Sequence, residues 1–189
     1  MKGSVIILGD SPFLGEIQDK LRYALDRYHS IGINNVITKY YTNEHIFVDK
    51  PFIALTNNFM GKTVTLKNYK SLIPKEDKEL YEIFPLNLKE HTEKDIFTED
   101  RVAWCGFTHD FAISYAIKKG FNKIILIGAA DFALGPHFST PYTFKYSSTC
   151  RNKSKQFIEN YALKLADIVT CNPKSILNVS KVSIDDLLK

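Results

Sequence analysis

The sequence has few cysteines and no paired cysteine motif. Its three cysteines are Cys105, Cys150 and Cys171, and none of them belongs to a C-x-x-C pair. An odd number of unpaired cysteines is typical of proteins kept in a reducing environment. The cysteine pattern therefore predicts a cytoplasmic protein.

Long hydrophobic runs are also missing. The apolar run at residues 5–8 follows the N-terminus closely and is far too short for a signal peptide or a membrane span. We therefore expect no transmembrane segment and expect any membrane-bound acceptor to be met from the cytoplasmic side.

The net charge of the chain is small. Lysine and arginine number 25 against 21 acidic residues, a formal net charge of +4 that is spread along the chain. This is weak support for an anionic partner such as a nucleotide, a glycan or nucleic acid. With 189 residues, 44% hydrophobic and 24% charged, the chain suits a single domain over 1–189 that needs no disulfide or metal to hold its core.

What is present is an alternation of buried strands and amphipathic helices. The apolar run 4–8 predicts a strand covered on both faces, and the spacing over 14–28 predicts a helix. A helix over 108–119, with Thr108 as its N-cap, precedes the clearest buried strand, at 124–128. Further segments are an extended stretch at 30–33, another at 52–56, a helix over 153–167, a last strand at 168–171 and a short helix after Ser183. The sequence therefore predicts an α/β, Rossmann-like fold with a mostly parallel sheet and helices on both faces.

The region 61–100 is the least regular. Residues 63–66 alternate like a strand and 80–88 are compatible with another, but 75–79 and 90–100 are charged. We predict an irregular insertion or lid there. The sequence neighbours Glu44 and His45 do not share a strand or helix face, and we expect both to be solvated.

Polar residues follow the predicted strands. In an open α/β sheet, ligands bind beyond the carboxyl ends of the strands, so these residues are the candidate site. They suit a nucleotide, because an asparagine amide supplies both donors and acceptors. The candidate nucleotide-binding residues are Gly9, Asp10, Ser11, Asn34, Asn57, Thr108, His109, Asp131 and Asn172.

The first turn, from Gly9 to Pro12, joins a strand to a helix. Backbone N–H groups and a helix N-terminus attract phosphate, although no glycine-rich fingerprint is present. The alternative is a plain turn in which Asp10 or Ser11 caps the helix.

Two histidines are candidates for chemistry. His137 lies on the loop after the clearest strand and could act as a general base, or it could be a surface histidine. His109, at the start of a helix, should be neutral because the helix dipole disfavours the imidazolium. It could face a phosphate, but we favour a capping role.

Tyr142 and Tyr146, with neighbouring basic residues, could contact an anionic ligand; the alternative is a loop whose aromatic rings pack locally. There is no H-E-x-x-H motif, no Walker loop and no Cys/His cluster with metal spacing, so we expect no metal.

The order of these motifs resembles the bacterial sialyltransferases of glycosyltransferase family 42 and related Rossmann-like proteins. The relatives include flagellin glycosylation factors and archaeal hydroxymethylpterin diphosphokinases. The matching elements are the first turn, the asparagines after the second and third strands, the helix over 108–121, the segment 128–132, His137-Phe138 and Cys171-Asn172-Pro173. The match covers both ends of the chain.

The resemblance implies a nucleotide-dependent transferase, specifically a metal-independent glycosyltransferase with a CMP-sugar as the expected donor. The first turn and the asparagines would hold the nucleotide. His137 would accept the proton of a glycan or other hydroxyl acceptor, and Tyr142 and Tyr146 would help the phosphate to leave. No cofactor is implied, and the sequence permits a homo-oligomer.

Two alternatives remain. A magnesium-dependent pyrophosphokinase of the same superfamily would use Asp10 and Asp131 as acidic ligands. The second alternative is a non-catalytic protein that binds a nucleotide or nucleic acid. It is considered because Asp10, Ser11 and Phe13 differ from the residues of the family at this turn.

Overall fold

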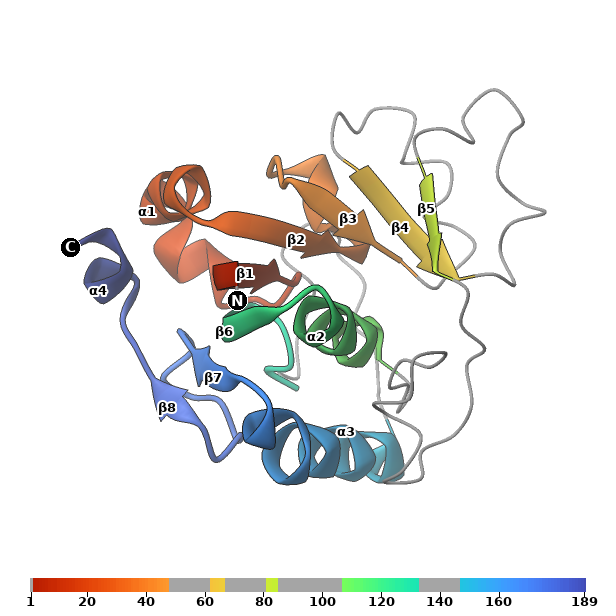
Figure 1. Cartoon of the computed structure of the whole chain (residues 1–189). Coiled ribbons are helices and arrows are strands. Elements are labelled where there is room, and N and C mark those ends of the chain that lie inside the picture. The colour runs from red at the N-terminus through yellow and green to blue at the C-terminus, as the bar shows by residue number, and fades with distance from the viewer. Residues whose placement is uncertain (1, 48–61, 67–80, 85–106, 133–146) are drawn as a thin grey trace.

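The computed structural model describes residues 2–47, 62–66, 81–84, 107–132 and 147–189 of the chain. Within these residues, eight parallel strands form one sheet in the order β5-β4-β3-β2-β1-β6-β7-β8 (Figure 1). The strands are β1 (Lys2–Leu8), β2 (His29–Ile33), β3 (Glu44–Ile46), β4 (Lys62–Leu66), β5 (Tyr81–Phe84), β6 (Phe121–Ile127), β7 (Asp167–Thr170) and β8 (Ser180–Lys181). The helices are α1 (Leu14–Arg27), α2 (Thr108–Lys118), α3 (Ser148–Asn160) and α4 (Ile184–Leu188), with 3₁₀ turns at Asn34–Thr38 and Ala162–Lys164.

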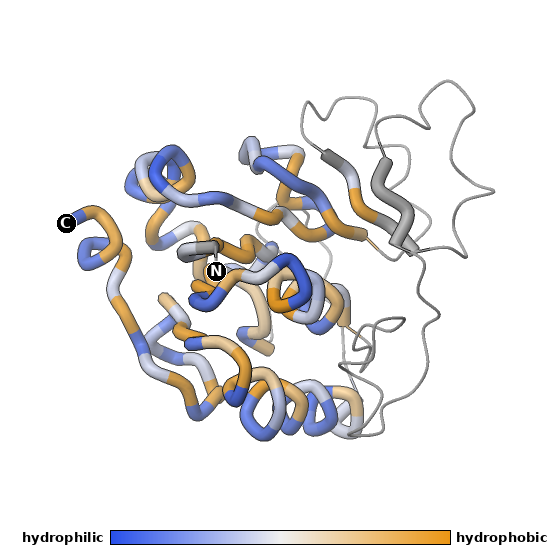
Figure 2. The backbone as a smooth tube through the Cα atoms, in the orientation of Figure 1, coloured by the Kyte–Doolittle hydropathy of each residue, from blue (hydrophilic) through white to orange (hydrophobic). Residues whose placement is uncertain are grey.

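The core lies on both faces of β1 and β6, which pair along most of their length. Alternate side chains of each strand enter opposite layers, as the pleat of a strand requires. Ile6 and Ile125 pack under α1 and α4, whereas Ile7 and Leu126 pack under α2 and α3. The tube in Figure 2 is accordingly hydrophobic through these central strands and mixed along the outer helices. The predicted Rossmann-like class, with helices on both faces, is confirmed.

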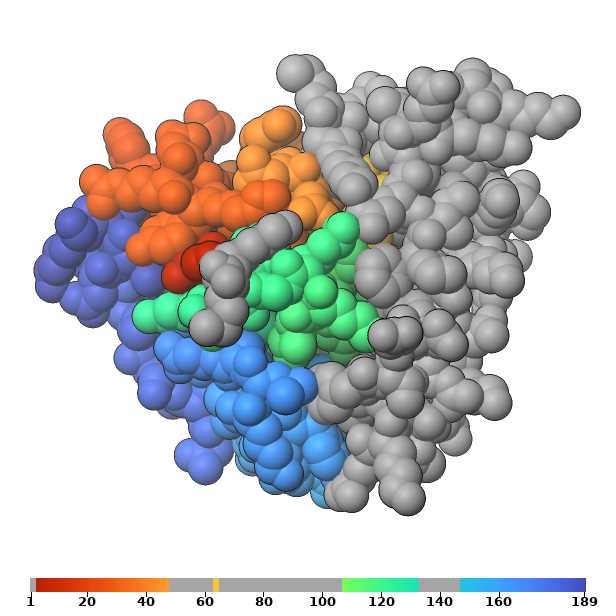
Figure 3. Space-filling view, in the orientation of Figure 1, coloured from red at the N-terminus to blue at the C-terminus, as the bar shows by residue number. Residues whose placement is uncertain are grey.

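The C-terminal helix α4 is fastened to α1. Lys20 forms an ion pair of 2.7 Å with Asp185, and the hydroxyl of Tyr28 donates to the carbonyl of Leu187 at 3.2 Å. Ser183 caps α4 as predicted. In the space-filling view the dark blue C-terminal segment adjoins the orange-red segment that contains α1 (Figure 3).

The predictions for the regular central elements are confirmed to within a few residues: the first strand, the first helix, the second helix and the clearest buried strand. Gly120 ends α2 with a φ of +85°, a conformation that suits glycine. The first nine residues of α2 are all buried, because this helix is enclosed between the sheet and α3.

Several predictions about the ends of elements were wrong. The N-cap of α2 is Phe107, and Thr108 is already helical. The helix predicted over 153–167 begins at Ser148 and ends at Asn160, and β8 follows the strand predicted to be last. Local sequence patterns predict the first and last residues of helices and strands poorly, because contacts with residues far away in the sequence determine these boundaries.

The prediction that Glu44 and His45 are solvated was also wrong. Both belong to β3, where Glu44 is 9% exposed and His45 is fully buried. The predicted segment 52–56 and most of the predicted insertion over 61–100 lie outside the described residues. The described strands β4 and β5 in that region continue the parallel sheet.

No helix among the described residues is both long enough and apolar enough to cross a membrane.

Glu44 is held by polar side chains at the amino edge of the sheet. His29 Nε2 lies 2.7 Å from one carboxylate oxygen, and the hydroxyl of Tyr115 donates to the other. The Lys119 ammonium lies 5.2 Å from the centre of the Tyr115 ring. Burial raises the pKa of Glu44, but the hydrogen bonds from His29 and Tyr115 outweigh burial and keep the pKa below its usual 4.5.

Replacing Glu44 with glutamine is expected to lower the free energy of unfolding by about 2 kcal/mol at pH 7, because hydrogen bonds to a charged acceptor are lost. A carboxyl whose pKa is lowered by folding stabilises the native state above its unfolded pKa, and this contribution is lost as the pH falls. The difference between the two proteins in urea unfolding should therefore shrink below pH 4.5. Glu16→Gln is the control, since its pair with Lys174 is exposed and should contribute less than about 1 kcal/mol. Equal effects of the two substitutions would contradict the assignment.

Candidate functional site

Among the described strands, the order of the sheet reverses at one topological switch point, between β1 and β6. From β1 the chain adds β2 to β5 on one side, and it then returns to add β6, β7 and β8 on the other. The loops that leave β1 and β6 therefore diverge, and ligands of open α/β sheets bind in the crevice at that point. This location defines the candidate site: the carboxyl ends of β1 and β6, with those of β2 and β7 beside them.

Ser11 and Asp131 meet across the switch point, although 120 residues separate them. The Ser11 hydroxyl donates to Asp131 Oδ2 at 2.6 Å, and its oxygen accepts from the amide of Phe13 at 3.2 Å. The Ser11 amide donates to the carbonyl of Gly128 at 3.1 Å. Ser11 thus has three partners and a defined position, which orients the Asp131 carboxyl.

Close backbone packing brings these two loops together. A Cβ atom on Gly9 would lie 2.3 Å from the carbonyl oxygen of Gly128 and 2.8 Å from the Cα of Ala129. Both distances are far below contact, so only glycine fits at position 9. Gly9 therefore sets the approach of the two strand ends.

The predicted role of the first turn in phosphate binding stays a prediction. The amides of Leu14, Gly15 and Glu16 each donate to a carbonyl three residues earlier. Asp10, in the same turn, is 7% exposed. The turn is therefore internally hydrogen-bonded in this structure.

Asp131 is the most perturbed carboxyl group of the site. It is 6% exposed, and burial raises its pKa to about 6 against the lowering effects of Ser11 and Asn172. Asn172 is near enough to influence the pKa, but no hydrogen bond of ordinary geometry reaches Asp131 Oδ1 from any described residue. A buried acceptor of this kind requires a donor, and a ligand N–H or O–H group would supply one.

Left-handed backbone surrounds the same carboxyl. Ala130 and Phe132, on either side of Asp131, have φ values of 55° and 50°, and Asn34 after β2 has 54°. Each such residue other than glycine costs about 1–2 kcal/mol, less for asparagine. Strained backbone of this kind concentrates at functional sites, and here it flanks the residue that bonds to Ser11.

Asn34 and Thr108 form a second polar pair at the end of β2. The Thr108 hydroxyl donates to Asn34 Oδ1 at 3.1 Å, so Thr108 joins α2 to β2 instead of capping its own helix. The backbone carbonyl of Asn34 accepts from His45 Nε2 at 3.0 Å. Burial lowers the pKa of His45 to about 4, so the ring is neutral with its proton on Nε2.

His109 does not cap α2, contrary to the favoured prediction. Its Nε2 lies 2.9 Å from the Ser154 hydroxyl, which lies 2.5 Å from Asp110 Oδ1. Burial, and not the helix dipole on which the prediction rested, lowers the pKa of His109 to about 3 and favours the neutral ring. The Ser154 hydroxyl donates to Asp110 Oδ1, because a carboxylate oxygen can only accept, and the Ser154 oxygen is then left to accept from Nε2 of His109.

This direction of hydrogen bonding decides the chemistry of the Ser–His–Asp group. A nucleophilic serine gives its proton to a histidine, and Ser154 does not. The group instead joins the first turn of α2 to α3. The ring of His109 also stacks on Phe107, at 4.9 Å between centroids, and meets the edge of Phe132 at 5.4 Å.

The structure thus brings together Gly9, Ser11 and Asp131, with Asn172 beside them, and pairs Asn34 with Thr108. The predicted residues Asn57, His137, Tyr142 and Tyr146 lie outside the described part of the chain. The sequence analysis missed Ser154, Asp110, His45 and Phe132, whose roles depend on partners far away in the chain. In the parts of the chain that the structure covers, no three His, Cys, Asp or Glu side chains are grouped as metal ligands.

Comparison with known proteins gives little further guidance. No protein-family model matches the chain, and no curated protein matches it. Among solved structures, a UDP-glucose 4-epimerase with UDP-glucose from the hyperthermophile Thermotoga maritima is similar, with a TM-score of 0.32 and 11% identity. The match covers 88% of this chain and 54% of the epimerase chain, so this chain spans about half the length of that enzyme. A similarity of this size carries no argument about function.

Proposed function

We propose that this protein is a nucleotide-dependent transferase, and more narrowly a metal-independent glycosyltransferase that uses a nucleotide-activated sugar. The observation that carries the proposal is the pairing of Ser11 with Asp131 at the β1/β6 switch point. It presents a buried carboxyl, one oxygen of which has no hydrogen-bond partner among the described residues, at the place where open α/β sheets bind nucleotides.

The helix dipoles favour an anionic ligand at the same edge. Helix α1 begins directly after the carboxyl end of β1, and Thr108 at the start of α2 bonds to Asn34 after β2. Ser154, in the middle of α3, bonds to the first turn of α2 but does not place the α3 N-terminus at this edge. Two helix N-termini, each with a partial positive charge, therefore lie at the edge where a phosphate would bind.

The polar groups also match a nucleoside in kind. Asp131 Oδ1 can only accept from a ligand when it is ionised, whereas the amide groups of Asn34 and Asn172 can donate. Asn172 Oδ1 already accepts from the Lys174 amide at 2.9 Å, and its side chain also lies close enough to Asp131 to lower the pKa of that carboxyl. Ribose hydroxyls and base edges need both kinds of partner.

The transfer itself would need a base and a leaving group. The acceptor hydroxyl would attack the anomeric carbon, the bond from that carbon to the phosphate oxygen would break, and the nucleotide would leave with the electron pair. We assign the acceptor proton to His137, and assistance to the leaving phosphate to Tyr142 and Tyr146, from the family resemblance alone. A CMP-sugar is the donor that this resemblance favours.

A panel of CMP-, UDP- and GDP-sugars tests the proposal. We expect at least one nucleotide sugar to raise the thermal unfolding midpoint and to broaden NMR signals from residues 9–11 and 128–132, while the free sugars do neither. Release of nucleotide in the presence of a hydroxyl acceptor, without added metal, would identify the transferase. If no nucleotide sugar shifts the midpoint or the signals, the proposal is wrong.

A non-catalytic nucleotide-binding protein is the second candidate. It is favoured by the internal hydrogen bonds of the first turn, which leave fewer amides for a reacting phosphate. Replacing His137 with alanine separates the two: retained binding with lost turnover indicates an enzyme. Binding without turnover in every form of the protein indicates the second candidate.

A further inference from the structure

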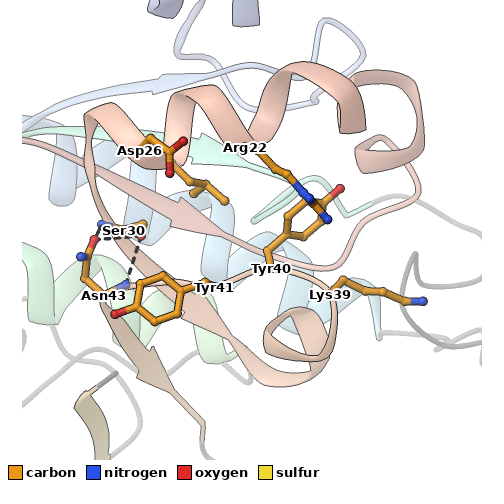
Figure 4. Close-up of a pocket in the computed structure, with 8 residues that line it drawn as sticks. Arg22, Asp26, Ser30, Lys39, Tyr40, Tyr41 and Asn43 are labelled. Carbon is orange, nitrogen blue, oxygen red and sulfur yellow. Dashed lines mark hydrogen bonds between the residues drawn. The ribbon is translucent and has the colours of Figure 1, made fainter. Parts of the chain in front are cut away.

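A pocket of about 520 Å³ lies away from the switch point, beside the outer half of α1. Arg22 and Asp26 of α1 form one wall, and Tyr40 and Tyr41, from the segment before β3, face them (Figure 4). Its volume is within the range of small-molecule sites. None of the predicted site residues lines it.

The pocket lies toward the amino ends of β2 and β3, whereas the candidate nucleotide site lies at the carboxyl ends of the strands. The floor of the pocket includes Ser30, the second residue of β2, and Asn43, which immediately precedes β3. The candidate nucleotide site, in contrast, lies beyond the last residues of β1 and β6. The pocket is therefore a separate feature.

Asn43 is held in one orientation. The side-chain oxygen Oδ1 of Asn43 accepts from the backbone N–H of Ser30 at 2.8 Å and from the Ser30 hydroxyl at 3.0 Å. The backbone N–H of Asn43 donates back to that hydroxyl at 3.2 Å. Figure 4 shows these bonds at the side of the pocket next to Tyr41. Because Oδ1 is occupied twice, the NH₂ group is the part of the side chain left to bind a ligand.

The two tyrosines differ in exposure. Tyr40 is 7% exposed, and burial raises its pKa, while the nearby Arg22 charge opposes that rise. Tyr41 is 61% exposed, an unusual exposure for a large aromatic ring. Tyr40 therefore forms a wall, and Tyr41 presents a ring to solvent at the rim.

The lining carries hydrogen-bond donors together with charges of both signs. Arg22 and Lys39 against Asp26 give a net charge of +1. A guanidinium recognises carboxylate or phosphate, one carboxylate accepts from hydroxyl groups, and an exposed ring packs against the apolar face of a sugar. We propose that this pocket binds an anionic monosaccharide, with Arg22 on its acidic group, Asp26 on its hydroxyl groups and Tyr41 against its ring.

The test uses three probes on the full chain: glucose, glucuronate and glucose 6-phosphate. NMR titration should show saturable shifts at residues 22–30 and 39–43 for the acidic probes and weaker binding of glucose. The comparison of glucuronate with glucose 6-phosphate decides whether the acidic group is a carboxylate or a phosphate. Absence of saturable shifts with both acidic probes, or equal binding of glucose, would overturn the proposal.

Two matched pairs of exposed residues test the assigned contacts. Arg22→Gln should weaken binding of the acidic probe about tenfold or more, whereas Lys39→Gln removes the same charge from a side chain that extends away from the others and should weaken it much less (Figure 4). Tyr41→Ala should weaken binding, and Tyr23→Ala, at an exposed tyrosine outside the pocket, should not. Thermal unfolding checks that all four variants are folded. Equal losses within either pair would overturn the assignment.

Discussion

Replacing Asp131 with asparagine is expected to stabilise the folded chain and at the same time to weaken nucleotide binding. The carboxyl is buried, its pKa is raised to about 6 from 3.8, and one oxygen has no partner among the described residues. Asparagine keeps the shape and can still accept from Ser11, but it carries no charge. The free energy of unfolding at pH 7 should therefore rise by up to about 3 kcal/mol.

The pH dependence follows from the same shift. Between pH 3.8 and about 6, the folded chain binds more protons at Asp131 than the unfolded chain does. Stability should therefore fall as the pH rises through this interval in the wild-type protein, and this part of the fall should be missing in Asp131→Asn. Urea unfolding at several pH values measures both effects.

The control is Asp167→Asn at the start of β7, where the carboxylate is 60% exposed beside Lys123. Its stability should change by less than about 1 kcal/mol. Nucleotide affinity should fall about 10- to 100-fold in Asp131→Asn, because a hydrogen bond to a charged acceptor is lost, and should be unchanged in the control. A destabilised Asp131→Asn protein would show that the carboxylate is structural.

Replacing Gly9 with alanine is expected to be the most destabilising single-methyl change in the described chain. The new Cβ would overlap the backbone of Gly128 and Ala129, and no side-chain rotation can relieve a clash with backbone atoms. Because the two loops would have to separate, the Ser11–Asp131 bond would be strained as well. We expect a loss of about 3 kcal/mol or more in the free energy of unfolding, or failure to fold.

Gly3→Ala provides the matched control, since a Cβ at that position meets nothing within 4 Å. It should be neutral or slightly stabilising, because alanine restricts the unfolded chain. Gly120→Ala has equal space but a φ of +85°, so it should lose about 1–2 kcal/mol through the backbone alone. If Gly9→Ala behaved like Gly120→Ala, the close contact at the switch point would not be a determinant of the fold.

The sequence predicted the elements whose signal is local. The run of apolar residues in β1 and β6, the stripe of α1 and the cap at Ser183 all act over a few residues, and each was confirmed. Strand β3 could not be predicted in the same way, because it is three residues long and begins Glu44-His45. Those side chains are buried only because Tyr115, His29 and Asn34 supply their partners.

The candidate site was predictable in position but not in bonding. Ser11 and Asp131 follow apolar strands, and parallel strands place their carboxyl ends at one edge, so their proximity follows from the fold class. Which atoms bond could not be foreseen. Thr108 shows the reason: the local sequence predicted that its hydroxyl caps its own helix, yet the hydroxyl binds Asn34, 74 residues earlier in the chain.

The order of the strands has a consequence for synthesis on the ribosome. The apolar strand β1 needs a neighbour on each side, and β2 follows it within about one helix, but β6 begins only at Phe121. At translation rates of about 5–20 residues per second, the second edge of β1 stays unpaired for on the order of ten seconds. A nascent chain with such an unpaired edge is prone to aggregate or to recruit chaperones. The late synthesis of β6, which completes the switch point, therefore also sets how long the nascent chain is prone to aggregation.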